Sequence, residues 1–211
     1  MTSSEGVPFV VLGAGSHARN LTKLIKEARP DCLVASLYFE VQETSRPTVG
    51  ICPEEWLPFI TEGAHWFLGL GENPLRESAF QTLSGCGLEP SIFKHASAEV
   101  FEGVRLGGGS VIGAVSYIGP GVRVGTGVIV NSGAVVEHEV SLGPFCHVAP
   151  NATLLGGVSL GKNVLVGASA VILPGVHVSN DVVIGAGSTV TRDLNEPGEI
   201  YAGSPAKRVR E

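Results

Sequence analysis

The amino-acid sequence predicts a small α/β domain followed by an all-β parallel solenoid. Residues 100–195 repeat every six residues without interruption, and each of the sixteen blocks begins with Val, Leu or Ile. Residues 7–93 instead alternate short apolar runs with stretches of helical periodicity. A strict short repeat is typical of a β-helix, whereas strands alternating with helices indicate a parallel α/β sheet.

The six-residue period fits short strands separated by corners, because it matches neither an α-helix nor a simple alternating strand. Three blocks form one triangular coil of about eighteen residues, stacked about 4.8 Å above the previous coil. The first position of each block points inward, and Gly at the second position in eight of sixteen blocks relieves strain at corners. Each coil buries its apolar positions on its neighbours.

The first part of the chain predicts a Rossmann-like domain with a parallel sheet. A helix is expected after Ser16, which is a plausible N-cap, and a second helix near Pro74, since proline suits a first helical turn. The strands are expected at residues 7–12, 32–39, 65–70 and 88–93. We therefore predict domains at residues 1–95 and 96–195 and a C-terminal tail at 196–211.

Composition and charge exclude several classes of partner. The net charge of −6 argues against nucleic acid or an anionic membrane as the main partner. There is no run of eighteen apolar residues, and the first residues lack the basic region and cleavage site of a signal peptide. The four cysteines form no CxxC pair and are interpreted as free thiols in a reducing compartment, so a cytoplasmic protein is expected.

Two glycine turns, at residues 13–15 and 69–71, follow predicted strands and would line one crevice. The backbone at these glycines can approach a bound group, and the helix after Ser16 offers N–H groups to an anion such as a diphosphate. The glycines could instead serve only tight turns. A redox dinucleotide is disfavoured because Ala18 replaces the third glycine of that fingerprint and Glu40 comes late for a ribose-binding acid.

Two histidines, His138 and His147, lie near the middle of the repeat, nine residues apart. Half a coil separates them, so one subunit is not expected to bring them together. Three solenoids packed side by side could bring His138 of one subunit to His147 of the next, which predicts a homotrimer. The alternative is that both are hydrogen-bonded surface histidines without a function. His177 is out of phase with His147, and we predict no metal site because zinc needs three converging ligands.

The sequence resembles the hexapeptide-repeat sugar acyltransferases that carry an N-terminal nucleotide-sugar-binding domain. These include sialic-acid O-acetyltransferases and N-acetyltransferases of nucleotide-linked 4-amino-4,6-dideoxy sugars. The resemblance implies a left-handed β-helix, acetyl-CoA as co-substrate and a nucleotide-linked sugar as acceptor. The matching segments run in order along nearly the whole chain: LGAGSHAR, LGLGENPLR, FKHASAEV, NSGAVVEHEVSLGPFCHVAPNATLLGGV and AGSPAKRV.

The resemblance also implies roles for individual residues. His138 matches the general base, and Glu139 the carboxylate that raises its basicity. Glu137 remains an alternative, because neighbours on a strand point to opposite faces. His147 matches a contact to the thioester end of the coenzyme, and N–H groups near Gly156 and Gly157 are candidates to stabilise the oxyanion.

The remaining predicted contacts divide between the two substrates. The coenzyme is expected to lie along a groove between two solenoids, at Ala168 and Ala186, and to reach the C-terminal tail, where Lys207 and Arg208 suit a phosphate. Where relatives often carry an Asp pair, this chain has Tyr38, Phe39 and Glu40. The residues expected to hold the nucleotide sugar are Gly15, Ser16, His17, Glu40, Gly71 and Asn73, with Arg76 as a weaker candidate.

The resulting expectation is a homotrimeric, acetyl-CoA-dependent N-acetyltransferase of a nucleotide-linked amino-deoxy sugar, active in the biosynthesis of lipopolysaccharide O-antigen. One alternative is O-acetylation of a sialic-acid-like sugar. Another is a non-catalytic solenoid that only binds a sugar nucleotide. The sequence leaves open the nucleotide, the sugar and the length of the acyl chain.

Overall fold

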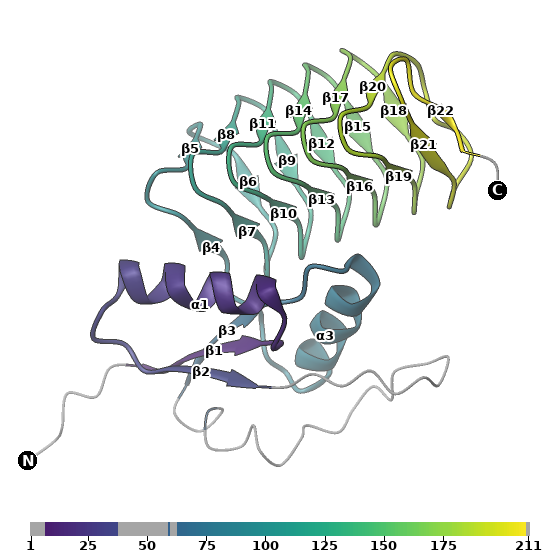
Figure 1. Cartoon of the computed structure of the whole chain (residues 1–211). Coiled ribbons are helices and arrows are strands. Elements are labelled where there is room, and N and C mark those ends of the chain that lie inside the picture. Colours follow the sequence, from purple (N-terminus) through teal and green to yellow (C-terminus); the bar gives the residue numbers. More distant parts are fainter. Residues whose placement is uncertain (1–6, 38–58, 60–62, 210–211) are drawn as a thin grey trace, which may run out of the picture. The chain divides into compact units, whose positions relative to one another are not determined.

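The chain divides into two compact units, Met1–Ser91 and Ile92–Glu211, so the division falls between Ser91 and Ile92 and not at the expected 95/96 (Figure 1). The computed structural model describes residues 7–37, 59 and 63–209. Among these residues, no helix is long and apolar enough to span a lipid bilayer.

The first unit contains a three-stranded parallel sheet in the order β2-β1-β3. The strands are β1 (Phe9–Leu12), β2 (Val34–Leu37) and β3 (His65–Leu68), and the helices are α1 (Ser16–Ala28) and α3 (Asn73–Gly85). Three of the four predicted strands and both predicted helices are confirmed. Gly15, without a side-chain cap, is the N-cap of α1, so the prediction that Ser16 caps this helix is wrong.

The sheet of the first unit has a helix packed on each face. Val10 and Leu12 of β1 form a buried cluster with Trp66 and Leu68 of β3 and with side chains of α3. Successive residues of a strand point to opposite faces, and Val11 lies on the side of α1: a Cβ built on Gly69 would stand 2.7 Å from Val11 and 2.8 Å from Ala18 of α1.

The second unit is a parallel β-solenoid of short strands, as the repeat predicts (Figure 1). Its eight-stranded sheet contains β4 (Phe93–Lys94), β7 (Val111–Ile112), β10 (Ile129–Val130), β13 (His147–Val148), β16 (Leu165–Val166), β19 (Val183–Ile184), β21 (Ile200–Ala202) and β22 (Lys207–Arg208). Its six-stranded sheet contains β5 (Glu99–Val100), β8 (Tyr117–Ile118), β11 (Val135–Val136), β14 (Thr153–Leu154), β17 (Val171–Ile172) and β20 (Thr189–Val190). Its five-stranded sheet contains β6 (Arg105–Leu106), β9 (Arg123–Val124), β12 (Ser141–Leu142), β15 (Ser159–Leu160) and β18 (His177–Val178).

The solenoid begins one strand earlier than the repeat indicates. The predicted last strand of the first unit, at residues 88–93, is wrong: β4 pairs with β7, and the Phe93 N–H donates to the Ser110 carbonyl at 2.9 Å. The pattern hides this strand because Lys94 occupies the position that is aliphatic in every later block.

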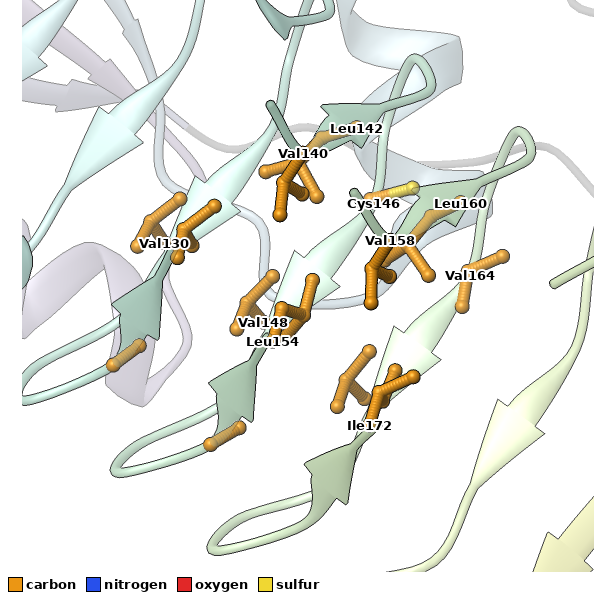
Figure 2. Packing of buried hydrophobic residues seen from close by; sticks show 14 of the residues in the cluster. Val130, Val140, Leu142, Cys146, Val148, Leu154, Val158, Leu160, Val164 and Ile172 are labelled. Atoms are coloured by element: carbon orange, nitrogen blue, oxygen red, sulfur yellow. The ribbon is translucent and has the colours of Figure 1, made fainter. Parts of the chain in front are cut away.

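The interior of the solenoid is a stack of aliphatic side chains from successive coils (Figure 2). Val130 pairs in register with Val148, 18 residues later, and both are fully buried. Each such side chain contributes about 1.5–3 kcal/mol by leaving water. Cys146 also points inward, where its thiol donates to the Gly161 carbonyl at 3.0 Å.

The sequence predicts that all cysteines are free thiols, and the structure departs from this prediction at one of them. Cys32 and Cys146 are free, as predicted. Cys86, which lies in the first unit, is disulfide-bonded, so the interpretation of every cysteine as a free thiol is wrong for this residue.

The outer faces of the solenoid differ in polarity. In the eight-stranded sheet the residue before each inward-pointing side chain is apolar in most coils and is buried or half-buried, as at Val111, Ile129 and Leu165. In the five-stranded sheet the same position holds Arg105, Arg123, Ser141, Ser159 and His177. The five-stranded face is therefore suited to water, whereas apolar residues of the eight-stranded face such as Val111 and Ile129 are already buried within the chain.

The C-terminal residues form a hairpin that continues the eight-stranded sheet. β21 pairs in parallel with β19, and β22 returns antiparallel to β21. The Ala206 N–H donates to the Thr189 carbonyl at 2.8 Å, and the Ser204 hydroxyl donates to the Thr189 hydroxyl at 2.9 Å. The hairpin thus closes the last coil, as the end of a solenoid requires.

Candidate active site

His138 and Glu139 lie on a corner of the solenoid, in the turn between β11 and β12. Both side chains are exposed, and Nδ1 of His138 lies 3.5 Å from a carboxylate oxygen of Glu139. The sequence left open whether Glu137 or Glu139 meets the imidazole. In the structure, Glu139 provides the carboxylate next to Nδ1.

Glu139 reaches His138 because its backbone is left-handed, with φ of 60°. The equivalent positions of the neighbouring coils, 18 residues apart, hold Gly103, Gly121, Gly157 and Gly175, with φ between 72° and 83°. For a residue with a Cβ this conformation costs about 1–2 kcal/mol. A costly conformation at an exposed corner, where other coils have glycine, is a recurrent property of functional sites.

Replacement of Glu139 by glycine is expected to affect stability and activity in opposite directions. The free energy of unfolding should rise by up to about 1 kcal/mol, because the relieved strain exceeds the added chain entropy of glycine. kcat should fall about tenfold, which corresponds to about 1.4 kcal/mol in the barrier. Thermal unfolding and a thiol-release assay measure the two effects.

Two further variants test whether the loss of the Glu139 carboxylate causes the expected fall in kcat. Val115→Gly removes an exposed side chain from another left-handed position, with φ of 56°, and should stabilise the chain without loss of activity. Glu139→Gln keeps the side-chain shape and removes its charge. If Glu139→Gly retained full kcat, the carboxylate would have no part in the reaction.

Gly156, one coil beyond His138, provides the space in which the imidazole lies. A Cβ built on Gly156 would overlap Cε1 and Nε2 of His138 and would stand 3.1 Å from Cδ2. The adjacent Gly157 N–H donates to the His138 carbonyl at 2.9 Å. Within the part of the chain that the structure describes, the Gly156 N–H has no backbone acceptor, which leaves this donor available to a ligand oxygen.

His147 lies on β13, a strand of the eight-stranded sheet. The turn that carries His138 joins the other two sheets. The expectation that one solenoid does not bring these histidines together therefore agrees with their positions. Nε2 of His147 lies 3.2 Å from Nδ2 of Asn131, a contact between neighbouring coils that the sequence pattern does not reveal.

The other predicted coenzyme residues occupy one corner, between the eight-stranded and six-stranded sheets. Ala168 and Ala186 are exposed there on successive coils, and the Gly187 N–H donates to the Ala168 carbonyl at 2.8 Å. A Cβ on Gly185 would stand 3.1 Å from the Cβ of Ala202, which pairs in register with Lys207. Lys207 therefore lies beside the last coil, beyond Ala186 on the same corner.

Arg208 has a different environment from Lys207. Its guanidinium contacts Glu196 at 2.7 Å and Glu199 at 2.5 Å. Two carboxylates thus offset its charge, which makes it a weaker candidate for a coenzyme phosphate than the sequence implies. Lys207 is exposed.

The predicted nucleotide-sugar residues of the first unit gather where β1 and β3 end. A Cβ on Gly13 would stand 3.0 Å from the Gly69 carbonyl oxygen, so the two glycine turns are in contact. Gly15 and Ser16 are exposed, and a Cβ on Gly71 would stand 3.7 Å from the Cβ of His17. The two glycine turns therefore lie side by side, as the sequence predicts.

Asn73 and Arg76 are buried next to the second glycine turn. Arg76 donates to the carbonyl oxygens of Leu70 and Gly71, at 3.1 and 2.9 Å, and to the side-chain oxygen of Asn73 at 2.8 Å. These bonds hold the second glycine turn in place, so both residues support this turn and do not present side chains to solvent.

His17 is held in its neutral form. Burial, together with the nearby Arg76 charge, lowers the pKa of His17 to about 4. Its Nε2 is buried and has no hydrogen-bond partner in the described chain. Glu40, with Tyr38 and Phe39, lies outside the described residues. Among those that are described, no group of three or more His, Cys, Asp or Glu is placed to hold a metal ion.

Comparisons with known proteins support this arrangement. The family described as hexapeptide repeat of succinyl-transferase matches residues 157–192. PerB from Caulobacter crescentus, solved with CoA and GDP-perosamine, is 33% identical, with a TM-score of 0.84 over 96% of this chain and 97% of that chain. The acetyltransferase domain of PglB from Neisseria gonorrhoeae is 26% identical, with a TM-score of 0.81 over 97% of this chain and 100% of that domain.

A variant of the Caulobacter crescentus GDP-perosamine N-acetyltransferase, also with CoA and GDP-perosamine, is 30% identical, covers 97% of each chain and has a TM-score of 0.83. A comparison with curated proteins found no significant match. The similarity to PerB exceeds 30% identity and extends over nearly the full length of both chains, through both units and the corner that carries His138. This chain belongs to the hexapeptide-repeat sugar acetyltransferases.

Proposed function

We propose that this protein is an acetyl-CoA-dependent N-acetyltransferase that acts on the amino group of a nucleotide-linked amino-deoxy sugar. The observation that carries the proposal is the exposed corner where the His138 imidazole lies next to the Glu139 carboxylate and in the space that Gly156 leaves open. A base beside an oxyanion donor is the arrangement that direct acyl transfer requires. The similarity to PerB, solved with CoA and GDP-perosamine, supports the same substrate classes.

In the proposed reaction, Glu139 favours the tautomer of His138 that carries its proton on Nδ1, which leaves the lone pair on Nε2. The substrate nitrogen attacks the thioester carbonyl carbon and gives up a proton to Nε2. The Gly156 N–H stabilises the negative oxygen of the tetrahedral intermediate, which collapses with cleavage of the C–S bond. The leaving thiolate takes a proton from the imidazolium, so the base is regenerated.

The reaction needs no acyl-enzyme. Cys146, the thiol nearest in sequence to His138 and His147, is fully buried inside the solenoid. A side chain without solvent access cannot attack a bound thioester. Direct attack by the amine is therefore the proposed route.

The first unit is proposed to be a Rossmann-like domain that binds the nucleotide part of the acceptor. The helix α1 offers backbone N–H groups next to Gly15 and Ser16, where an anionic diphosphate is stabilised. The uncharged His17 and the Gly71 backbone would line the same crevice, and Glu40 is proposed as a further contact. Recognition mainly through the nucleotide agrees with the short turns of the solenoid.

The coenzyme is proposed to extend along the corner of Ala168 and Ala186 to Lys207 in the C-terminal hairpin, with His147 at its thioester end. This corner and the His138 corner are on different sides of one left-handed solenoid. A complete site would therefore combine two subunits of a homotrimer.

The product is proposed to serve the biosynthesis of surface polysaccharide, such as the O-antigen of lipopolysaccharide. The cytoplasm is the compartment expected for a reaction that consumes acetyl-CoA.

The proposal is tested by incubating the protein with acetyl-CoA and a panel of UDP-, dTDP- and GDP-linked amino sugars. We expect thiol release with at least one amino sugar, an alkali-stable amide product, and no release with the matched sugar that carries a hydroxyl in place of the amine. An alkali-labile ester would indicate O-acetylation. Binding of a sugar nucleotide with no thiol release from any donor would support the scaffold alternative and contradict the proposal.

A further inference from the structure

Arg192 is an exposed cation on the same corner of the solenoid as His138. His138 follows the end of β11 by two residues, and Arg192 follows the end of β20 by two residues. The strands β11, β14, β17 and β20 are consecutive in the six-stranded sheet (Figure 1). Arg192 therefore occupies, three coils later, the position that His138 occupies in its own coil.

The backbone on both sides of Arg192 is fixed by the preceding coil. Before it, Thr189 of β20 pairs in register with Val171 of β17. After it, Oδ1 of Asp193 accepts the His177 N–H at 2.8 Å, and the Leu194 N–H donates to the His177 carbonyl at 2.9 Å. The turn is thus held in place before any ligand binds, which lowers the entropic cost of using it as a contact.

The guanidinium of Arg192 is not neutralised. Within the part of the chain that the structure describes, it has no ion pair and no hydrogen bond. The acidic side chains that follow it bind other groups: Asp193 accepts the His177 N–H, and Glu196 and Glu199 contact Arg208. Arg192 therefore keeps its charge and its N–H donors for an anion, in contrast to Arg208.

The corner between His138 and Arg192 is uncharged. Gly156 and Pro174 occupy the equivalent positions of the two intervening coils, and the residues before them are the half-buried Leu155 and Leu173. Along this corner a base and a cation are thus separated by a strip of small and apolar residues.

The length and polarity of this strip match the pantetheine arm of a coenzyme A thioester. Coils rise by about 4.8 Å, so three coils separate the two positions by about 14 Å. The pantetheine arm is uncharged, and its chain from the thioester sulfur to the first phosphorus equals four to five extended residues, or about 15 Å. We infer that Arg192 binds the diphosphate of the acetyl-CoA whose thioester lies at His138. The inference rests on the proposed function.

The inferred contact complements the one proposed for Lys207. In solenoids packed side by side around a cyclic axis parallel to their length, equivalent residues lie at the same height. Arg192 of one subunit would then face the end of the Ala168 and Ala186 corner of the next, where Lys207 lies. The coenzyme would pass between two walls, each of which contributes one cation for its phosphates.

The inference is tested by isothermal titration calorimetry of CoA into the full-length protein without an acceptor sugar. Arg192→Gln should raise the Kd for CoA about tenfold, the effect of one lost charge-assisted hydrogen bond. The same factor is expected with dephospho-CoA, which keeps the diphosphate and lacks the 3′-phosphate. An unchanged Kd for CoA would overturn the inference. A loss seen with CoA but not with dephospho-CoA would overturn the assignment to the diphosphate.

Arg123→Gln is the matched control. Arg123 is also exposed and has no ion pair in the described chain, but it lies in β9 on the five-stranded face. The variant removes the same charge and should leave the Kd for CoA unchanged. If Arg123→Gln weakened CoA binding as much as Arg192→Gln does, net charge and not a specific contact would be the cause, which would also overturn the inference.

Kinetics separates this inference from the proposed function. Arg192→Gln should raise the KM for acetyl-CoA about tenfold and leave kcat and the KM for the sugar nucleotide unchanged, because a remote phosphate contact is the same in the ground state and the transition state. A wild type that binds CoA but releases no thiol with any amino sugar would contradict the proposed function, while the calorimetry would still decide the role of Arg192. A wild type that binds no CoA would overturn both.

Discussion

Replacement of His138 by alanine is expected to lower kcat by about 10²- to 10⁴-fold, the usual contribution of a positioned general base. The fold should be unaffected, because the side chain is exposed on a corner and contributes nothing to the aliphatic stack. Binding of CoA and of the sugar nucleotide should persist, since the Gly156 N–H and the first unit are unchanged. A thiol-release assay measures the rate, and isothermal titration calorimetry measures the binding.

His177→Ala is the matched control for this variant. His177 is also exposed on the solenoid, where its ring contacts the Ser159 hydroxyl at 2.9 Å, but it lies in the five-stranded sheet. It should retain normal kcat. Full turnover by His138→Ala would remove the proposed base and with it the proposed mechanism.

Co-expression of His138→Ala with His147→Ala tests whether one active site takes His138 and His147 from two different subunits. If each site takes His138 from one subunit and His147 from the next, random mixing restores about one quarter of the sites although each variant alone is defective. If both residues belonged to one subunit, mixed assemblies would gain nothing over the separate variants. The measurement is specific activity of tagged, purified mixed oligomers.

Replacement of Gly156 by alanine is the second change with a large expected effect. The new methyl group would occupy the space of Cε1 and Nε2 of His138, so the imidazole must move. Displacement of a reacting group by about 1 Å can cost on the order of 100-fold in rate, and we expect kcat to fall by this amount. Stability should change by less than about 1 kcal/mol, because the backbone of Gly156 is outside the left-handed region and alanine can adopt it.

A double-mutant cycle identifies the cause of this loss. Alanine at position 156 keeps the backbone N–H, so the proposed oxyanion donor remains. In the His138→Ala background the methyl group has no imidazole to displace, and Gly156→Ala should then have no further effect on kcat. Additive losses in the double variant would show that Gly156 acts independently of His138.

The two units differ in how far their structures could be predicted. The solenoid follows from the aliphatic residue at every sixth position, and only its first strand escapes detection, where Lys94 interrupts the pattern. In the first unit, the strands that end at glycine turns are predicted correctly. The segment before β4 is misassigned because an apolar run of this length is compatible with either sheet, and pairing with β7 decides the matter.

The candidate site shows the same division at the level of single residues. The spacing of His138 and His147 predicts that they lie on different sides of the solenoid, and the adjacent glutamates indicate a carboxylate near the base. That Glu139, and not Glu137, lies next to the imidazole depends on the left-handed backbone of Glu139, with φ of 60°. The six-residue period does not predict this dihedral angle. The contact between Asn131 and His147 likewise joins different coils.

The sequence by itself determined the solenoid, the order of its corners and the residue types available there. These features are periodic, and the inward or outward direction of each side chain follows from its position in the block. The tertiary structure alone decided that Gly156 makes room for the imidazole, that Arg208 is neutralised by two carboxylates and that Asn131 faces His147. These contacts join residues 9 to 18 positions apart. Their geometry depends on how coils stack and turns bend, which the period does not specify.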